Sequence, residues 1–255
     1  MFALTINPNA KPGRHAGLPY KSVILFSMHF IILTLLVLAV IFGPQMWAQY
    51  TFRRYSKPSP AIPGTGGELA QHLLQRFDMH EVKVEKTERQ GDHYDPTRKV
   101  VCLSTSNYDD NSLTAVAVAA HEVGHAIQHH RNEAMLTLRT RLAMLALLAQ
   151  KLGAAAMMAM PLVIFISRAP SSGLLMLVIG FGSLLIGTLV HLITLPVEID
   201  ASFGKALPVL LKGEYIRKED EAAVRQILRA AALTYLAASL SSLLNLWYWL
   251  RLLRR

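Results

Sequence analysis

The residues best suited to chemistry are His121, Glu122 and His125, which have the spacing H-E-x-x-H. Positions four apart share one face of a helix, so both imidazoles can reach one Zn²⁺ at about 2.0–2.1 Å. Glu122 follows the first histidine, and its carboxylate can take a proton from a water whose pKa the metal lowers to about 7. The preceding turn, 116–120, consists of small apolar residues, so the three polar residues are expected to be buried. Burial of polar side chains costs free energy unless they bind a partner, which favours a functional role. The spacing therefore predicts a catalytic zinc site.

A catalytic zinc takes a third protein ligand and keeps one position for water. His129 continues the histidine stripe, but on a straight helix it lies about 12 Å along the axis from His121, too far to share a metal. Glu198 is the preferred candidate, because an even number of predicted membrane crossings places it on the same side as His121. Asp200 is an alternative ligand, or it orients a histidine from outside the ligand set. His191 is a candidate only for a metal deep in the bilayer, and both carboxylates are alternatively solvated interfacial charges.

Two helices are predicted in a soluble region around this motif. Residues 68–77 place their leucines and a phenylalanine at helical spacing. Residues 109–112 supply N-cap candidates for a second helix, from about Leu113 to about Arg131. The second helix carries the H-E-x-x-H residues, so its packing is expected to set the geometry of the metal site.

Two short stretches, 81–86 and 99–104, alternate between polar and apolar residues and flank a turn at 91–96. Together they predict a β-hairpin. We expect a peptide substrate to lie extended along residues 100–104. The only cysteine, Cys102, falls in this strand, which indicates a buried apolar role and leaves no cysteine for a disulfide or a zinc knuckle.

Long apolar runs divide the rest of the chain. Val23–Gly43 is long enough to span a bilayer, for which about 20 residues suffice, and reads as an uncleaved anchor. Leu142–Ile166 and Gly173–Leu195 predict a membrane hairpin, and Ala230–Leu250 either spans or lies on the surface. The predicted division is a tail (1–22), an anchor (23–43), a soluble metallopeptidase region (44–141), a hairpin (142–196), a segment with the third ligand (197–229) and a C-terminal transmembrane or interfacial helix (230–255).

The composition agrees with a membrane protein, since 52% of the 255 residues are hydrophobic and 17% are charged. The net charge of +9 comes from basic residues beside the apolar runs, which suits lipid headgroups. No basic patch is interleaved with aromatic residues, so nucleic acid is not an expected partner. The hairpin tip carries only Arg168, whereas its feet carry several basic residues, which predicts cytoplasmic feet and a cytoplasmic soluble region. The arginines at 251–255 favour the opposite side if the last run crosses.

Several motifs occur in a fixed order: D-H-Y-D-P at 92–96, L-S at 103–104, A-A-H-E-V-G-H-A-I-Q at 119–128 and L-P-V-E-I-D-A-S at 195–202. In this combination the chain resembles the YugP-like neutral zinc metallopeptidases, a family of bacterial membrane proteins. The resemblance covers most of residues 64–207. It implies that two histidines, His121 and His125, are metal ligands and that Glu122 is the catalytic base.

A looser likeness concerns the third ligand. In membrane-bound Ste24 and HtpX type peptidases the glutamate ligand precedes an alanine by three residues, and Glu198 and Ala201 fit that pattern. Those relatives have an aspartate four positions after the ligand, where this chain has Ser202. The likeness therefore implies that Glu198 is the third ligand. The residue four positions after the ligand differs from that of those peptidases.

The sequence as a whole predicts a mainly α-helical, multi-pass protein of the bacterial plasma membrane with a small α+β, zincin-like metallopeptidase domain. The expected function is zinc-dependent hydrolysis of peptide bonds in peptides or membrane proteins. Tyr94, His93 and Tyr215 are candidates for oxyanion or substrate contacts. The alternative is a non-catalytic membrane scaffold or chaperone-like protein with a structural metal or none. The sequence does not indicate the oligomeric state.

Overall fold

The computed structural model describes residues 20–88 and 91–233 of the chain. The chain divides into two compact units, Met1–Ala39 and Val40–Arg255, and each is considered by itself. Helix α1 (Tyr20–Arg54) contains the predicted anchor, and its C-terminal part belongs to the second unit. The predicted tail up to residue 19 and the C-terminal run beyond residue 233 lie outside the described residues. The mainly helical class with a small sheet is confirmed.

Local caps explain where the helices of the soluble region begin. Helix α2 (Gly66–Arg76) starts at Thr65, whose side chain accepts from the Glu68 N–H while the Glu68 carboxylate accepts from the Thr65 N–H. Helix α3 (Thr105–Asp109) is a single short turn. Helix α4 (Leu113–His130) starts at Ser112, whose hydroxyl oxygen accepts from the Ala115 N–H. Both predicted helices are therefore present, close to their expected bounds.

Within the described residues three strands form one sheet, in the order β1-β3-β2. Strand β1 (Lys83–Thr87) runs parallel to β3 (Val100–Ser104), and β2 (His93–Asp95) is antiparallel to β3. The predicted hairpin between 81–86 and 99–104 is therefore wrong. Residues 93–95, read from the sequence as part of a turn, form a strand of their own and let the chain return in the direction of β1.

This topology also corrects the expected position of a peptide substrate. Strand β3 is the middle strand, and it pairs with β1 and with β2 over Val100–Cys102. Its main chain is therefore already bonded on both edges in this stretch, so an extended peptide cannot pair along it. The sheet and α4 instead build a shared core with α2, η1 (Asp200–Ala206) and α7 (Leu207–Lys212).

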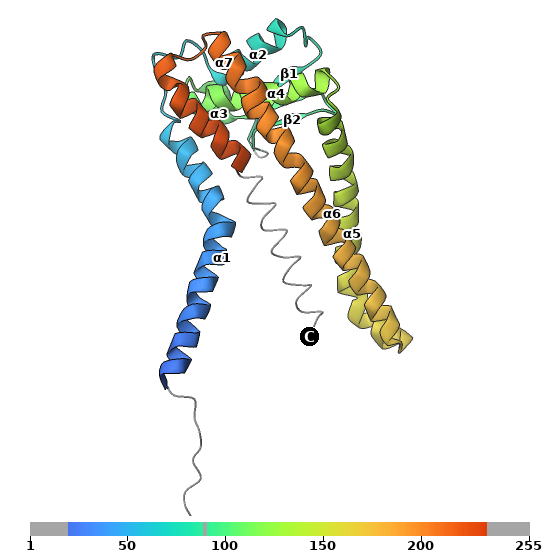
Figure 1. Cartoon of the computed structure of the whole chain (residues 1–255). Helices are drawn as coiled ribbons and strands as arrows, with labels where there is room; N and C mark the ends of the chain where they lie inside the picture. Colours follow the sequence, from blue (N-terminus) through green and yellow to red (C-terminus); the bar gives the residue numbers. More distant parts are fainter. Residues whose placement is uncertain (1–19, 89–90, 234–255) are drawn as a thin grey trace, which may run out of the picture. The chain divides into compact units, whose positions relative to one another are not determined.

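Two long helices, α5 (Ala134–Ser167) and α6 (Pro170–Ile199), run side by side as an antiparallel pair (Figure 1). They pack through small residues, because a Cβ at Gly153 would lie 2.2 Å from Oγ of Ser183. Two stretches, Ala134–Ser167 and Ser171–Lys212, are long and apolar enough to cross a membrane. The hairpin thus has the predicted form, while its insertion, and that of the anchor within α1, remain predictions.

The helices of the pair extend beyond their apolar runs toward the soluble region. Helix α6 continues without a break into the π-helical segment η1 and then into α7. A 3₁₀ turn, η2 (Lys218–Asp220), precedes a last described helical stretch at 221–233. The end of α6 and the start of η1 therefore lie against α4, at the level of the H-E-x-x-H residues.

Gly124 permits this contact between α4 and η1. A Cβ at Gly124 would lie 2.7 Å from the carbonyl oxygen of Ala201, closer than real Cβ contacts. Ala201 itself is fully buried. The two backbones therefore meet where any residue larger than glycine would hold them apart.

Replacing Gly124 with alanine should lower the free energy of unfolding by about 1–3 kcal/mol, because the added methyl group overpacks the α4–η1 contact. Thermal or denaturant unfolding in detergent measures this change. Gly182→Ala on α6 is the matched control, since a Cβ there meets nothing within 4 Å. Equal stability of the two variants would contradict this account of the contact.

Candidate metal centre

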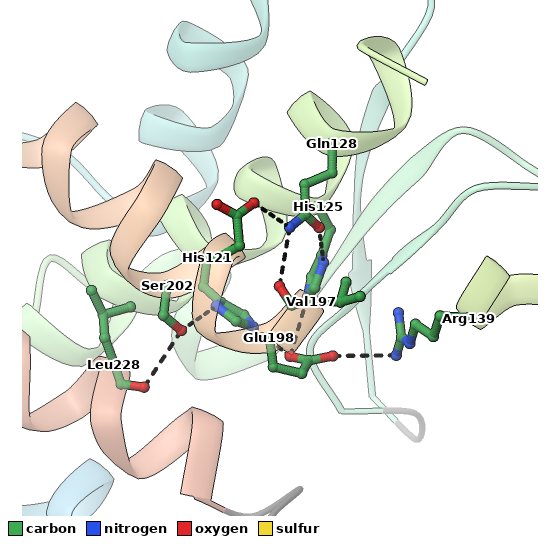
Figure 2. Close-up of polar contacts among 9 residues, drawn as sticks. His121, His125, Gln128, Arg139, Val197, Glu198, Ser202 and Leu228 are labelled. Atoms are coloured by element: carbon green, nitrogen blue, oxygen red, sulfur yellow. Dashed lines mark hydrogen bonds and ion pairs between the residues drawn. The ribbon is translucent and has the colours of Figure 1, made fainter. Parts of the chain in front are cut away.

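His121 and His125 lie on the buried face of α4, where every residue from Thr114 to Gln128 is buried. Their rings are one helical turn apart, with centroids separated by 4.8 Å and planes inclined by 80°. The Nε2 atoms of both rings point toward the end of α6 (Figure 2). A helix rich in alanine allows this burial, because its small side chains let other elements pack closely around the imidazoles.

Glu198, at the end of α6, completes the group. Its side chain is 0% exposed, and its Oε2 lies 3.3 Å from Nε2 of His121 and 3.3 Å from Nε2 of His125. The three ligand atoms lie within 4.8 Å of one another. Two ligands at 2.0–2.1 Å from a tetrahedral zinc are about 3.3–3.4 Å apart, so the spacing to Oε2 fits such an ion. The structure thus brings together three residues predicted as ligands.

The hydrogen bonds of Gln128 define the tautomer of His125. The Gln128 amide nitrogen donates to the Val197 carbonyl at 3.0 Å and to Oδ2 of Asp200 at 2.8 Å, two groups that can only accept. Its Oε1 therefore faces Nδ1 of His125, at 3.0 Å, and must accept from an N–H there. Nδ1 of His125 carries a proton, and Nε2 of the neutral ring is left with a lone pair.

Ser202 holds the ring of His121. Its hydroxyl forms a hydrogen bond of 3.0 Å with Nδ1 of His121 and lies 3.5 Å from the Leu228 carbonyl (Figure 2). This bond orients the ring so that Nε2 of His121 is directed at Glu198.

Three possible metal ligands therefore converge on one buried place. Nε2 of His121 and Nε2 of His125 each lie 3.3 Å from Oε2 of Glu198, a separation that needs a positive charge, either a proton or a metal ion, between nitrogen and carboxylate. The other carboxylate oxygen, Oε1, is buried and accepts no hydrogen bond from any described residue. A catalytic zinc ion takes three nitrogen or carboxylate ligands from the protein and keeps a fourth position open. His121, His125 and Glu198 fit such an ion.

Glu122 lies beside this group and faces a cavity of about 400 Å³ that His121 also lines. Burial raises the pKa of the Glu122 carboxyl to about 7; Glu198 and Asp92 also raise it, whereas His121 opposes the shift. Asp92, which also lines this cavity, accepts from the Ser104 main chain and hydroxyl and from the Asn107 amide. A buried carboxyl with a pKa near neutrality is suited to taking and giving a proton.

Asp200 lies outside the ligand group, although it is two residues from Glu198. Its Oδ2 accepts from the amide of Gln128 at 2.8 Å and from Nζ of Lys205 at 2.7 Å. Of the two roles left open by the sequence, this geometry favours orientation of His125 through Gln128 over direct ligation.

The three expected oxyanion or substrate contacts do not line the cavity beside Glu122. The Tyr94 hydroxyl bonds to His129 at 2.8 Å, and burial raises the pKa of this phenol to about 12. Nδ1 of His93 bonds to the carbonyl of Gly91. Tyr215 lines another cavity, where its hydroxyl contacts His72 and accepts from Arg76, each at 2.8 Å. Their contact with a substrate or an oxyanion therefore stays a prediction.

Sequence reasoning missed Gln128 and also Arg139, whose Nη2 lies 3.3 Å from Oε1 of Glu198. It left the part of Ser202 undefined. Gln128 carries a usable signal, because a buried amide three residues after a ligand histidine faces the same side of the helix. Ser202 follows Glu198 by one helical turn, in the place where looser relatives have an aspartate. Arg139 gave no signal, since it is one of several basic residues at the feet of the hairpin.

Comparison with known proteins agrees with this geometry. The family described as "Putative neutral zinc metallopeptidase" matches residues 30–254. A protein of Bacillus subtilis (strain 168) named "Putative membrane protease YugP" is 38% identical over 229 residues, which cover 86% of this chain and 94% of that protein. No solved structure matches the chain. The chain belongs to this family of neutral zinc metallopeptidases, and the resemblance seen in its motifs is confirmed.

Ser202→Ala should lower zinc affinity about 10–100-fold, because Nδ1 of His121 loses the hydrogen-bond partner that holds the ring in its orientation. Competition with a chromophoric chelator in detergent measures the affinity. Ser167→Ala, an exposed serine at the hairpin tip, should bind zinc as the wild type does. If the two variants have the same affinity, Ser202 does not support the histidine.

Proposed function

We propose that the chain is a membrane-bound, zinc-dependent endopeptidase in which His121, His125 and Glu198 hold the metal and Glu122 is the general base. The observation that carries this proposal is the convergence of two buried imidazoles and a buried carboxylate, with Nδ1 of each ring hydrogen-bonded to another side chain. Membership in a family of neutral zinc metallopeptidases supports the same reading.

The chemistry divides between the metal and the chain. When bound, zinc supplies an acidified water and a Lewis acid for the peptide carbonyl. Glu122 takes the proton of the attacking water on a carboxylate oxygen and then delivers it to the nitrogen of the leaving amine. The same carboxyl group thus acts as base first and as acid afterwards. Gln128 and Ser202 keep the two imidazoles in place during this cycle.

The cavity beside Glu122 supports peptides as the substrate class. Its walls include the apolar side chains Phe52, Val118, Ile227 and Leu228, which suit hydrophobic side chains of a peptide. Phe52 lies near the C-terminal end of α1, the helix that contains the predicted anchor. A peptide in this cavity would thus lie next to the end of a membrane helix, which favours segments of membrane proteins close to the bilayer as substrates.

The proposed location is the bacterial plasma membrane, with the metal on the cytoplasmic side. Two described helical stretches suited to crossing, and a Bacillus subtilis relative named as a membrane protease, support membrane association. The feet of the hairpin carry more positive charge than its tip, which favours the cytoplasm for the feet and for the site between them.

Glu122→Gln should retain zinc and lower the rate of casein or peptide cleavage by about 10²–10⁴-fold, because the amide cannot accept the proton of the water. Zinc content and cleavage are measured on the same detergent-purified sample. Glu219→Gln changes an exposed glutamate in the same way and should cleave as the wild type does. Full cleavage by Glu122→Gln would exclude the proposed mechanism.

Glu198→Ala should lose bound zinc together with cleavage, because only two imidazoles remain to hold the metal. Metal analysis after dialysis, followed by an attempt to restore cleavage with added zinc, measures the loss. A wild type without metal, indistinguishable in every assay from Glu122→Gln and Glu198→Ala, would instead favour the non-catalytic scaffold.

A further inference from the structure

Arg139 is the cation that faces the side of Glu198 turned away from the histidines. It lies near the start of α5, before the apolar run of that helix, and its side chain is 28% exposed. Its Nη2 lies 3.3 Å from Oε1 of Glu198, and Figure 2 shows the guanidinium approaching the carboxylate from the side opposite the rings. The pair therefore joins the first helix of the hairpin to the end of the second.

The contact divides the two oxygens of Glu198 between two partners. Oε2 is directed at both Nε2 atoms, and Oε1 is directed at Arg139. Oε1 accepts no hydrogen bond from any described residue, so its ion pair with Arg139 is the contact that offsets the charge at that end of a side chain with 0% exposure. A buried carboxylate without a cation at this end would be free to rotate toward solvent or toward another donor.

The type of side chain matters as much as its charge. A guanidinium is planar, stays charged at all working pH values and presents donors in a fixed fork, so it restricts the rotation of a carboxylate. A lysine supplies a point charge without that restriction. The neighbouring Arg141 lies on the same foot of the hairpin but is exposed, and it has no ion pair among the described residues.

We propose that Arg139 is a positioning residue for the metal site: its guanidinium holds Oε1 of Glu198 so that Oε2 is presented, together with His121 and His125, to a divalent cation. This inference rests on the proposed ligation by Glu198. It assigns to the hairpin a part in the site beyond anchoring, because α5 supplies the residue that orients a ligand from α6.

A purely structural role is the competing account. In it, Arg139 only ties the feet of α5 and α6 together, so its loss lowers stability without changing how the folded protein holds a metal. The two accounts predict different zinc affinities and different Co²⁺ absorption spectra for variants that remain folded. Neither readout requires peptide cleavage, so a failure of the inference is distinguishable from a failure of the proposed peptidase function.

The test compares wild type, Arg139→Gln, Arg139→Lys and the control Arg141→Gln, all as full-length protein in detergent with folding checked by circular dichroism. Zinc affinity is measured by competition with a chromophoric chelator, and Co²⁺ is added as a probe whose visible absorption reports ligand geometry. We expect Arg139→Gln to bind zinc about 10–100-fold more weakly and to change the Co²⁺ spectrum. Arg139→Lys should recover part of the affinity, and Arg141→Gln should match the wild type.

Wild-type zinc affinity and an unaltered Co²⁺ spectrum in folded Arg139→Gln would overturn the inference. If Arg139→Gln does not fold, Arg139→Lys decides the question: a folded lysine variant with the wild-type affinity and spectrum also overturns it. Zinc binding by the wild type without cleavage of casein would count against the peptidase function and leave the role of Arg139 standing.

Discussion

The close approach of α4 and η1 is the constraint on which the rest of the site depends. With Gly124 facing the carbonyl of Ala201, two backbones meet without a side chain between them. The histidines of α4 and the glutamate at the end of α6 are then near enough to face one another. The hydrogen bonds from Gln128 to Val197 and from His121 to Ser202 cross this same junction. A ligand set drawn from residues 73 positions apart thus rests on one glycine.

The contact between α4 and η1 contains polar side chains surrounded by apolar ones. Their hydrogen bonds restrict the orientation of both histidine rings. The Gln128 amide donates its two protons to the Val197 carbonyl and to Asp200, and its oxygen faces Nδ1 of His125. The Ser202 hydroxyl is hydrogen-bonded to Nδ1 of His121 at 3.0 Å. The chain thereby fixes the orientation of both rings before any ligand arrives. Such preorganisation lowers the reorganisation needed when a cation binds.

Some of this arrangement follows from sequence pattern, and some does not. The histidine spacing is local, and Glu198 follows from counting apolar runs, so both were predicted. Alternation of polar and apolar residues is the same for parallel and antiparallel strands, so the direction of β1 relative to β3 was not accessible. Arg139 looks like any basic residue at the foot of a span, and only the fold shows that Glu198 lies opposite. Ser202 faces His121 because η1 is π-helical, and no pattern in the sequence predicted this π-helical segment.

The π-helical segment also constrains the length of the chain. Segment η1 holds Asp200–Ala206 in wider turns than an α-helix, directly after Glu198. Removing one residue from it would rotate all that follows by about 100° about the helix axis. Leu228, whose carbonyl oxygen lies 3.5 Å from the Ser202 hydroxyl, belongs to the part of the chain that follows η1. The number of residues across 198–206, and not their type alone, therefore determines whether the chain after η1 meets the site in the right orientation.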